Sequence, residues 1–291
     1  MPATPAPRPR ALRVAAAQTQ PVPGAIAANA AAAAELIATA ATAGAAVVVF
    51  PELSLCGYDL PLLRADPKRC AVTTTDPRLD PLRQACRDHH AVALVGACVA
   101  RSSGRTLSVL VLDRHGEVTA SYDKQILWGP ERELFRPGRR GCTIELDGWR
   151  LGLGVCYEIN FPEHARDAAS AGMDAYLCQT ASSTARRRGR LLAARAMENT
   201  CYVVLANHTG PTRHGHFAGH SVIYDPYGRR LAAAGRTPGV ITGDLDPGVL
   251  ARAREAYTVL ADVPATLGTR RLVRIGDRQP PKATTRLITS S

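Results

Sequence analysis

The chain has 291 residues, of which 46% are hydrophobic, so it can bury the core of one large domain or two small ones. Basic residues outnumber acidic ones by 36 to 25, but the arginines are scattered along the sequence. The densest cluster lies within residues 186–190 and lacks interleaved aromatic residues, and only 5% of the chain is aromatic. This composition argues against a nucleic-acid-binding surface.

The eight cysteines contain no CxxC pair and are typical of reduced thiols in a cytoplasmic protein. Residues 1–10 are rich in proline and arginine, which predicts disorder, and they lack the apolar run of a secretory signal. Residues 14–63 carry no lysine or arginine, but Asn29 and Glu35 interrupt their alanine tract. We therefore expect a helix and a strand there, and no membrane span.

The first predicted elements are a strand over 12–20 and a helix over 25–43, which Gly44 ends. The unbroken apolar run 45–50 is typical of a strand that is buried on both faces of a sheet. It leads directly to Pro51 and Glu52. This position makes Glu52 the first candidate for a catalytic residue.

A helix is expected around 79–89, followed by a strand over 91–100. The next two apolar segments flank the turn 114–117 and predict a hairpin that ends at Lys124. Lys124 is thus a second polar residue at the end of a strand.

The strand predicted over 150–155 runs into Cys156, and a helix is expected over 162–171. Later elements are strands at 175–179, 201–207, 219–234 and 239–246 and helices near 188–200 and 247–258. No linker or repeat interrupts this alternation, so we predict one α/β domain over 11–260, followed by a basic tail over 261–291.

Three predicted strands are thus followed by a carboxylate (Glu52), an ammonium (Lys124) and a thiol (Cys156). Cleavage of an unactivated amide through a covalent intermediate needs a thiolate, a proton acceptor and a positive charge for the developing oxyanion. The three side chains meet that requirement if the fold brings them together. Considered alone, a cysteine after a buried strand is more often an inert core thiol.

The segments around these residues resemble motifs of one family, the nitrilase superfamily of carbon–nitrogen hydrolases. The similarity covers roughly residues 12–258, and its five motifs occur in the family's order: PELSLCGYDLP (51–61), YDKQILWGPERELFRPG (122–138), GVCYEINFPE (154–163), ARAMENTCYVVLANHTG (194–210) and FAGHSVIYDPYGRRL (217–231). The resemblance implies a four-layer α-β-β-α sandwich within the α/β class.

The resemblance also implies a role for each residue of the triad. Cys156 would attack the carbonyl carbon and Glu52 would act as general base, while Lys124 and the backbone N–H of Tyr157 would bind the oxyanion. A second glutamate would support the lysine; Glu131 has the better spacing and Glu133 is the rival. The residues expected to contact substrate are Tyr157, Glu133, Tyr58, Trp128, Thr180 and Ser182.

Two segments depart from the family's pattern. Where relatives often have a tryptophan or proline, this chain has TASSTARRRGR (180–190), which predicts a polar and basic pocket wall. The arginines at 186–190 are either a solvated helix start or a site that attracts an anionic substrate. The arginine-rich C-terminal signature is also degraded around 261–271.

Histidines offer two alternatives to this chemistry. His214, His216 and His220 resemble a loose metal site, but their spacing does not describe a helical pair, and we favour a glycine-rich loop beside the active site with His220 lining the pocket. Cysteine–histidine catalysis with one of the eight histidines stays open, since nothing singles one out.

We therefore expect an amidase or N-carbamoyl-amide hydrolase that forms a thioester on Cys156 and needs no cofactor or metal. A nitrilase or an N-acyltransferase would use the same triad, and a catalytically silent binding protein is an alternative of a different class. By analogy with the family, we expect a homodimer or higher homo-oligomer that pairs through its helices, with no nucleic-acid or membrane partner.

Overall fold

The structure is a computed structural model that describes residues 9–213 and 215–264. Residues 1–261 form one compact unit and residues 262–291 another. In the second unit the described residues 262–264 contain no helix or strand. The expected disorder of residues 1–8 and most of the predicted tail, 265–291, lie outside the described residues.

The first sheet has seven strands in the order β15-β1-β2-β4-β5-β6, with β3 also paired to β4. Strands β1, β2 and β4 run parallel at its centre, while β15, β5 and β6 extend it by antiparallel pairing. Their bounds are β1 (Leu12–Gln18), β2 (Val47–Val49), β3 (Ala71–Val72), β4 (Val92–Arg101), β5 (Gly104–Leu112), β6 (Val118–Asp123) and β15 (Gly239–Leu245).

The second sheet has six strands in the order β14-β13-β10-β9-β8-β7. Its central strands β8, β9 and β10 are parallel, and antiparallel strands flank them. Their bounds are β7 (Thr143–Leu146), β8 (Trp149–Val155), β9 (Ala175–Thr180), β10 (Tyr202–Asn207), β13 (Val222–Tyr224) and β14 (Arg230–Ala233).

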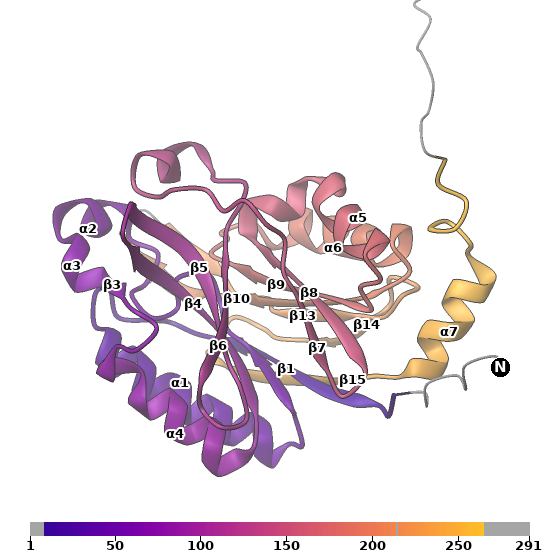
Figure 1. Cartoon of the computed structure of the whole chain (residues 1–291), viewed down its shortest axis with the longest axis horizontal. Helices are drawn as coiled ribbons and strands as arrows, with labels where there is room; N and C mark the ends of the chain where they lie inside the picture. The colour runs from indigo at the N-terminus through magenta and orange to yellow at the C-terminus, as the bar shows by residue number, and fades with distance from the viewer. Residues whose placement is uncertain (1–8, 214, 265–291) are drawn as a thin grey trace, which may run out of the picture. The chain divides into compact units, whose positions relative to one another are not determined.

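Helices cover the outer faces of the two sheets (Figure 1). The first sheet is covered by α1 (Ile26–Thr42) and α4 (Asp80–His89), and the second by α5 (Pro162–Ser170) and α6 (Ala185–Glu198). The inner faces pack together through the contacts of β1 and β2 with β9 and β10. The predicted four-layer α-β-β-α sandwich is therefore confirmed.

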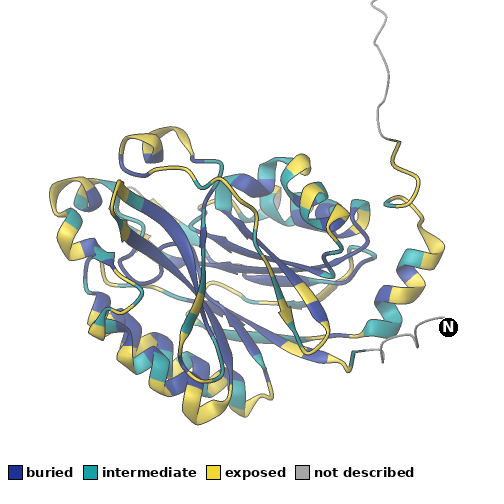
Figure 2. Cartoon of the chain, viewed as in Figure 1, coloured by how far each residue is buried: buried dark blue, intermediate teal, exposed yellow. Residues whose placement is uncertain are grey.

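Burial explains why these segments form these layers. Strand β2 consists of three valines that are all buried. The helix α1 buries residues spaced three and four apart, which places them on the face that meets the sheet: Ile26, Asn29, Ala30, Ala33, Ile37 and Ala40. Figure 2 shows the consequence, since the central strands are buried and the helices are exposed on their outer sides.

Several short elements were not anticipated from the sequence. They include the helices α2 (Leu60–Ala65) and α3 (Pro67–Cys70), the 3-10 turns η1 (Pro77–Leu79), η2 (Gly129–Glu133) and η3 (Cys156–Asn160), and a separate hairpin of β11 (Thr209–Thr212) and β12 (Gly215–Ala218). The last predicted helix, expected over 247–258, is present as α7 (Pro247–Ala256). Among the described residues, no helix combines the length and the apolar character needed to cross a bilayer.

Strand direction brings the predicted catalytic residues to one edge. Because β6 is antiparallel to β5, and β5 to β4, β6 runs in the same direction as β2 and β4. A parallel bridge between Thr19 and His208 joins the ends of β1 and β10, so strands of the two sheets end together. Glu52, Lys124 and Cys156 therefore follow strands that end at a shared edge.

The turn that carries Glu52 packs directly against Gly96 of β4. A Cβ atom at Gly96 would lie 2.2 Å from Pro51 O and 2.5 Å from Leu53 N. We predict that Gly96→Ala lowers the free energy of unfolding by about 3 kcal/mol and the melting temperature by roughly 6–12 °C, because the obstructing atoms are backbone.

Thermal unfolding followed by circular dichroism checks this prediction. Gly129→Ala is the matched control, since a Cβ there meets nothing within 4 Å. Equal melting temperatures for both variants would show that the turn at Glu52 can move aside.

Candidate active site

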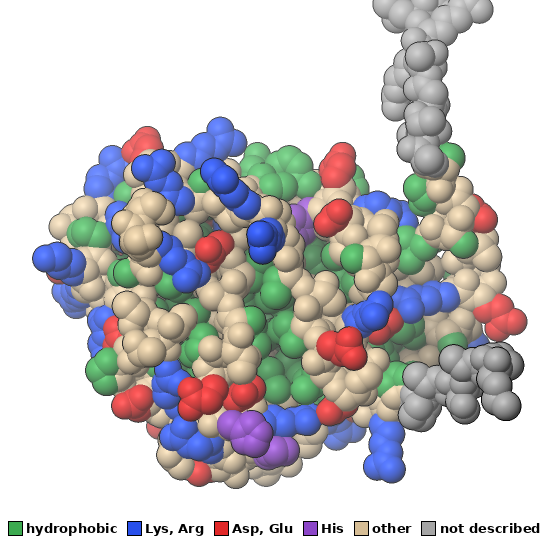
Figure 3. All heavy atoms as spheres, in the orientation of Figure 1, with side chains coloured by type: hydrophobic (Ala, Val, Ile, Leu, Met, Phe, Trp, Pro, Cys, Tyr) green, Lys and Arg blue, Asp and Glu red, His purple; other side chains and the backbone are tan. Residues whose placement is uncertain are grey.

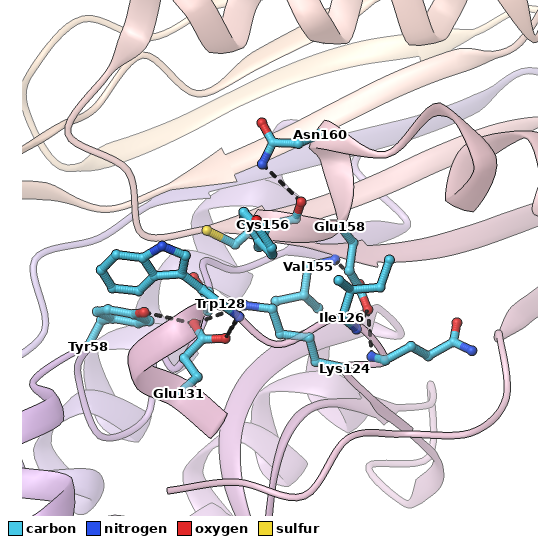
Figure 4. Close-up of polar contacts among 12 residues, drawn as sticks. Tyr58, Lys124, Ile126, Trp128, Glu131, Val155, Cys156, Glu158 and Asn160 are labelled. Carbon is cyan, nitrogen blue, oxygen red and sulfur yellow. Dashed lines mark hydrogen bonds and ion pairs between the residues drawn. The ribbon is translucent and has the colours of Figure 1, made fainter. Parts of the chain in front are cut away.

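A buried ammonium between two buried carboxylates forms the centre of the site. Figure 4 shows the ammonium of Lys124 beside one of them, Glu131. Lys124 Nζ donates to Glu52 Oε1 at 2.6 Å and to both carboxylate oxygens of Glu131 at 2.9 Å. All three side chains are fully buried. The expected proximity of Glu52 and Lys124 is thus observed, and Glu131 occupies the supporting position.

Neighbouring donors fix the Glu131 carboxylate. Tyr58 donates its hydroxyl to Oε1 at 2.7 Å, and the backbone N–H of Trp128 donates to Oε2 at 2.8 Å. Glu133, which was expected to contact substrate, does not line the cavity that contains Cys156. It lies on the surface, where its exposed side chain pairs with Arg64, because the turn η2 directs residues 131 and 133 to different sides.

Cys156 lies at the sharp junction between β8 and η3. Its φ of 49° is in the left-handed region, which a residue with a side chain seldom adopts and which is common at functional sites. Arg188 Nη1 donates to the Cys156 carbonyl at 3.0 Å. The turn projects the cysteine into a cavity of about 880 Å³ that Glu131 also lines.

The electrostatics of the site favour a neutral thiol on Cys156 and a charged ammonium on Lys124. Burial raises the pKa of Glu52, and the charge of Lys124 opposes that rise. Burial also raises the pKa of the Cys156 thiol, and the Glu52 charge adds to the effect. For Lys124, burial alone would lower the pKa, but the charges of Glu52 and Glu131 raise it.

Glu52 keeps one oxygen available for a proton. Its Oε2 atom is buried without a hydrogen-bond partner among the described residues, while Oε1 binds Lys124. Interaction with the Cys156 thiol helps to stabilise the charged form of Glu52, so the two groups are close enough to affect each other. A buried and unpaired carboxylate oxygen beside a neutral thiol is the arrangement that general-base catalysis requires.

Most of the residues expected to contact substrate line the cavity: Tyr58, Trp128, Tyr157 and Ser182 do so, together with proline residues and Phe217. Thr180 does not. Thr180 is fully buried, and interaction with its hydroxyl lowers the pKa of the Cys156 thiol against the effect of burial.

Glu158 is a buried residue that the sequence reasoning missed. Its Oε1 accepts hydrogen bonds from the backbone N–H of Gln125 at 2.6 Å and from the Tyr122 hydroxyl at 2.8 Å, and its Oε2 accepts from Val155 N–H at 2.7 Å. One carboxylate thus joins the loop after Lys124 to the strand before Cys156. The only signal in the sequence was an acidic residue two positions after the nucleophile.

His208 was also missed. Its Nε2 lies 2.7 Å from the Glu52 carbonyl oxygen and its Nδ1 lies 3.0 Å from Thr19 Oγ1. Nδ1 also lies 3.3 Å from the Thr19 carbonyl oxygen, but the contact of Nε2 with a carbonyl is the shorter one. Because a carbonyl only accepts, the proton is assigned to Nε2, and Nδ1 accepts from the threonine hydroxyl. Burial lowers the pKa of His208 to about 4, so a neutral imidazole from the second sheet binds the backbone of Glu52, which follows a strand of the first sheet.

The segment expected to be a glycine-rich loop is instead the hairpin β11–β12. His216 lines the cavity that contains Cys156, whereas His220, which was expected there, lines a neighbouring hollow. His214 lies outside the described residues. Within the described part of the chain, no three His, Cys, Asp or Glu side chains are grouped to hold a metal ion.

On the face shown in Figure 3, the lysine and arginine side chains are dispersed among acidic and uncharged ones, as their scattered positions in the sequence suggested. The arginine cluster begins helix α6, and Arg187 and Arg188 line the active-site cavity. The side chain of Arg186 is outside the described part of the structure.

The fold and site define a hydrolase with a cysteine nucleophile on an α-β-β-α sandwich. Residues 13–255 match the carbon–nitrogen hydrolase family. The 2-oxoglutaramate amidase of Bacillus subtilis is 31% identical over 75% of this chain and 84% of its own length. An (R)-stereoselective amidase of a Pseudomonas species is 32% identical over 74% of this chain and 78% of its own length.

Solved structures of an amidase from Nesterenkonia sp. AN1 agree with these matches. One has a TM-score of 0.76 at 31% identity and covers 87% of this chain and 97% of its own. A glutamate-to-glutamine mutant of that amidase, with a TM-score of 0.75 at 32% identity over 86% of this chain and 96% of its own, shows the acetamide moiety of fluoroacetamide bonded to the active-site cysteine.

The chain belongs to the carbon–nitrogen hydrolase family. It is an enzyme that hydrolyses amide carbon–nitrogen bonds by means of a cysteine. The resemblance inferred from the five motifs is thereby confirmed.

The low pKa of His208 predicts a loss of stability in acid. In the unfolded chain His208 takes up a proton below about pH 6.5, whereas in the folded chain it does so only near pH 4. The free energy of unfolding therefore falls as the pH falls from 6.5 to 4. We predict a loss of about 3 kcal/mol from this group between pH 7.5 and pH 4.

Urea unfolding at the two pH values measures the effect by comparison with His208→Gln, which cannot take up the proton. Contributions from Glu52 and other groups occur in both proteins and cancel in the comparison. His115→Gln, at an exposed position, is the control and should behave like the wild type. An unchanged pH dependence in His208→Gln would contradict the role of this buried imidazole.

Proposed function

We propose that the chain hydrolyses small linear amides or N-carbamoyl compounds with Cys156 as nucleophile, Glu52 as general base and Lys124 as oxyanion ligand. The observation that carries this proposal is the Lys124 ammonium held between two buried carboxylates beside the cysteine. The similarity to the 2-oxoglutaramate amidase of Bacillus subtilis, and the cysteine adduct of the Nesterenkonia amidase, support an amide substrate.

In the first half of the reaction, Cys156 Sγ attacks the carbonyl carbon and its proton passes to Glu52 Oε2. The oxyanion of the tetrahedral intermediate binds Lys124 Nζ and the backbone N–H of Tyr157. Lys124 can offer a hydrogen there because its two contacts with Glu131 share one carboxylate. Protonated Glu52 then protonates the leaving nitrogen, and ammonia or an amine departs.

In the second half, Glu52 removes a proton from water, which attacks the thioester that remains on Cys156. Collapse of the second tetrahedral intermediate releases the carboxylic acid and returns the proton to the sulfur. Atoms and charge balance over the two halves, since Glu52 ends as it began. Among the described residues, Tyr58 and Trp128 would hold Glu131 and, through it, Lys124 in place.

A nitrilase or an acyltransferase is the second candidate, because either reaction would use the same three groups. Substrate and product analysis together separate them: an amidase releases the acid and ammonia or an amine from an amide, a nitrilase releases the acid and ammonia from a nitrile, and an acyltransferase forms a new amide. The amidase relatives favour the first of these outcomes.

We also propose a cytoplasmic homodimer. All eight cysteines are free thiols, which suits a reducing compartment. The helices α5 and α6 form the outer layer through which members of this fold could pair, and Met197 of α6 leaves 49% of its surface exposed.

Substitution of the three central residues tests the mechanism. We expect Cys156→Ala to abolish turnover and Glu52→Gln to lower kcat by roughly 10²–10⁴, since it removes the proton acceptor. Glu52→Gln should stay folded because Lys124 keeps Glu131 as partner. Ammonia release and intact-protein mass spectrometry, which detects an acylated Cys156, are the measurements.

Lys124→Met is expected to lose both activity and stability. It removes an oxyanion ligand, worth roughly 10²–10³ in kcat, and leaves two buried carboxylates unpaired, which costs about 3–5 kcal/mol. Turnover is therefore measured at a temperature where the variant is folded by circular dichroism. A Lys124→Met enzyme with wild-type kcat would remove the lysine from the mechanism.

The proposed dimer predicts a sedimenting species of twice the mass of the chain. Met197→Glu should shift the equilibrium toward monomer by at least tenfold, because it places a charge in an apolar contact. Ala32→Glu, at an exposed position of α1 on the opposite layer, is the control. A wild type that sediments as monomer at micromolar concentration would refute the dimer.

A further inference from the structure

Two arginines on the wall of the active-site cavity lack acidic partners. Arg187 Nη1 donates to Asn160 Oδ1 at 3.1 Å, and Arg188 Nη1 donates to the Cys156 carbonyl at 3.0 Å. Both acceptors are neutral. Arg188 Nε is buried without a hydrogen-bond partner among the described residues. The positive charge on this wall is therefore uncompensated.

The acidic residues that line the cavity are engaged elsewhere. Asp59 lies 3.6 Å from Arg213 and accepts the backbone N–H of Leu62 at the start of α2. Glu131 is bound to Lys124 and Tyr58. Neither carboxylate is available to neutralise Arg187 or Arg188.

A second hollow of about 1220 Å³ lies next to this wall, and we call it the basic annex. The annex and the active-site cavity share Ser183, Thr184, Arg187, Arg188, Thr209, His216 and Phe217. The annex adds Arg190, Arg230 and Arg236, and no aspartate or glutamate is among the described residues that line it. These three guanidinium groups form no hydrogen bond or ion pair with a described residue.

Arginines in a hollow without counter-charges attract anions and can bind carboxylate or phosphate oxygens through two parallel hydrogen bonds. The position of Arg188 ties this charge to the reaction, since the same side chain holds the carbonyl of the nucleophile. An anion on this wall would thus lie within the length of a small molecule from the sulfur.

We infer that the physiological amide carries an anionic group remote from the amide, and that Arg187 with the basic annex binds this group while the amide lies against Cys156. This inference rests on the proposed amidase function and narrows its substrate class to oxyanion-bearing amides, such as monoamides of dicarboxylic acids. A neutral aliphatic amide would leave the arginine wall without its partner.

Matched substrate pairs test the inference. Succinamate, glutaramate and adipamate differ from butyramide, pentanamide and hexanamide only in a carboxylate that replaces a methyl group. We expect kcat/KM of the wild type to be at least tenfold higher for the anionic member of one or more pairs, and this ratio to fall when salt screens the charges.

Variants of the wall then locate the binding group. Arg187→Met should lower the anionic-to-neutral ratio of kcat/KM by roughly 10- to 100-fold, the usual range for a lost charge-assisted hydrogen bond. Arg230→Met should act mainly on the longest pair. Arg139→Met, at an exposed position outside both hollows, is the matched control and should keep the wild-type ratio.

The outcomes separate this inference from the function on which it rests. Equal kcat/KM for both members of every pair, or an unchanged ratio in Arg187→Met, would overturn the inference and leave the amidase intact. Failure of every amide to acylate Cys156 would refute the proposed function itself. Stimulation of butyramide hydrolysis by inorganic phosphate would show that the annex binds a separate anion, which also overturns the inference.

Discussion

The fold is constrained above all by the need to bury an ammonium and two carboxylates in contact with one another. Each of these ions loses its hydration, and each loss costs several kcal/mol that only close and well-oriented partners offset. Lys124 meets Glu52 at 2.6 Å and Glu131 at 2.9 Å, which is the required proximity. Apolar side chains would fill the same space at lower cost, so the cluster is best explained by its chemistry.

Residues that follow strands of both sheets hold Glu52 and Lys124 in place relative to the sulfur of Cys156. Glu158 joins the loop after Lys124 to the strand before Cys156, and His208 reaches from the end of β10 to the carbonyl of Glu52. Cys156 itself has a left-handed φ, a strained conformation that such surrounding contacts must maintain. The two sheets therefore act as a frame that fixes three loop residues, and the cavity lies where the strands end.

The sequence predicted the strands and helices of the two sheets better than it predicted the side-chain contacts of the site. Apolar runs and turn residues located the central strands and main helices, because those patterns report burial directly. The position of Glu133 on the surface was not foreseen, because it depends on the short 3-10 turn η2, and the periodicity of the sequence did not predict that turn. Glu158 and His208 were not predicted because they bind backbone atoms that are distant in sequence, and the residue types in a sequence do not indicate such contacts.

The charges of the cluster and of the arginine wall complement each other. Glu52, Glu131 and Lys124 sum to one negative charge, and proton transfer from Cys156 to Glu52 keeps the total constant while the charge moves to the oxyanion. The buried site therefore never accumulates additional charge during attack, which a low-dielectric interior would resist. A substrate with its own anionic group would nevertheless be repelled by this cluster. Arg187 and Arg188 lie on the wall where such a group would approach, and they supply the compensating charge without entering the proton transfers.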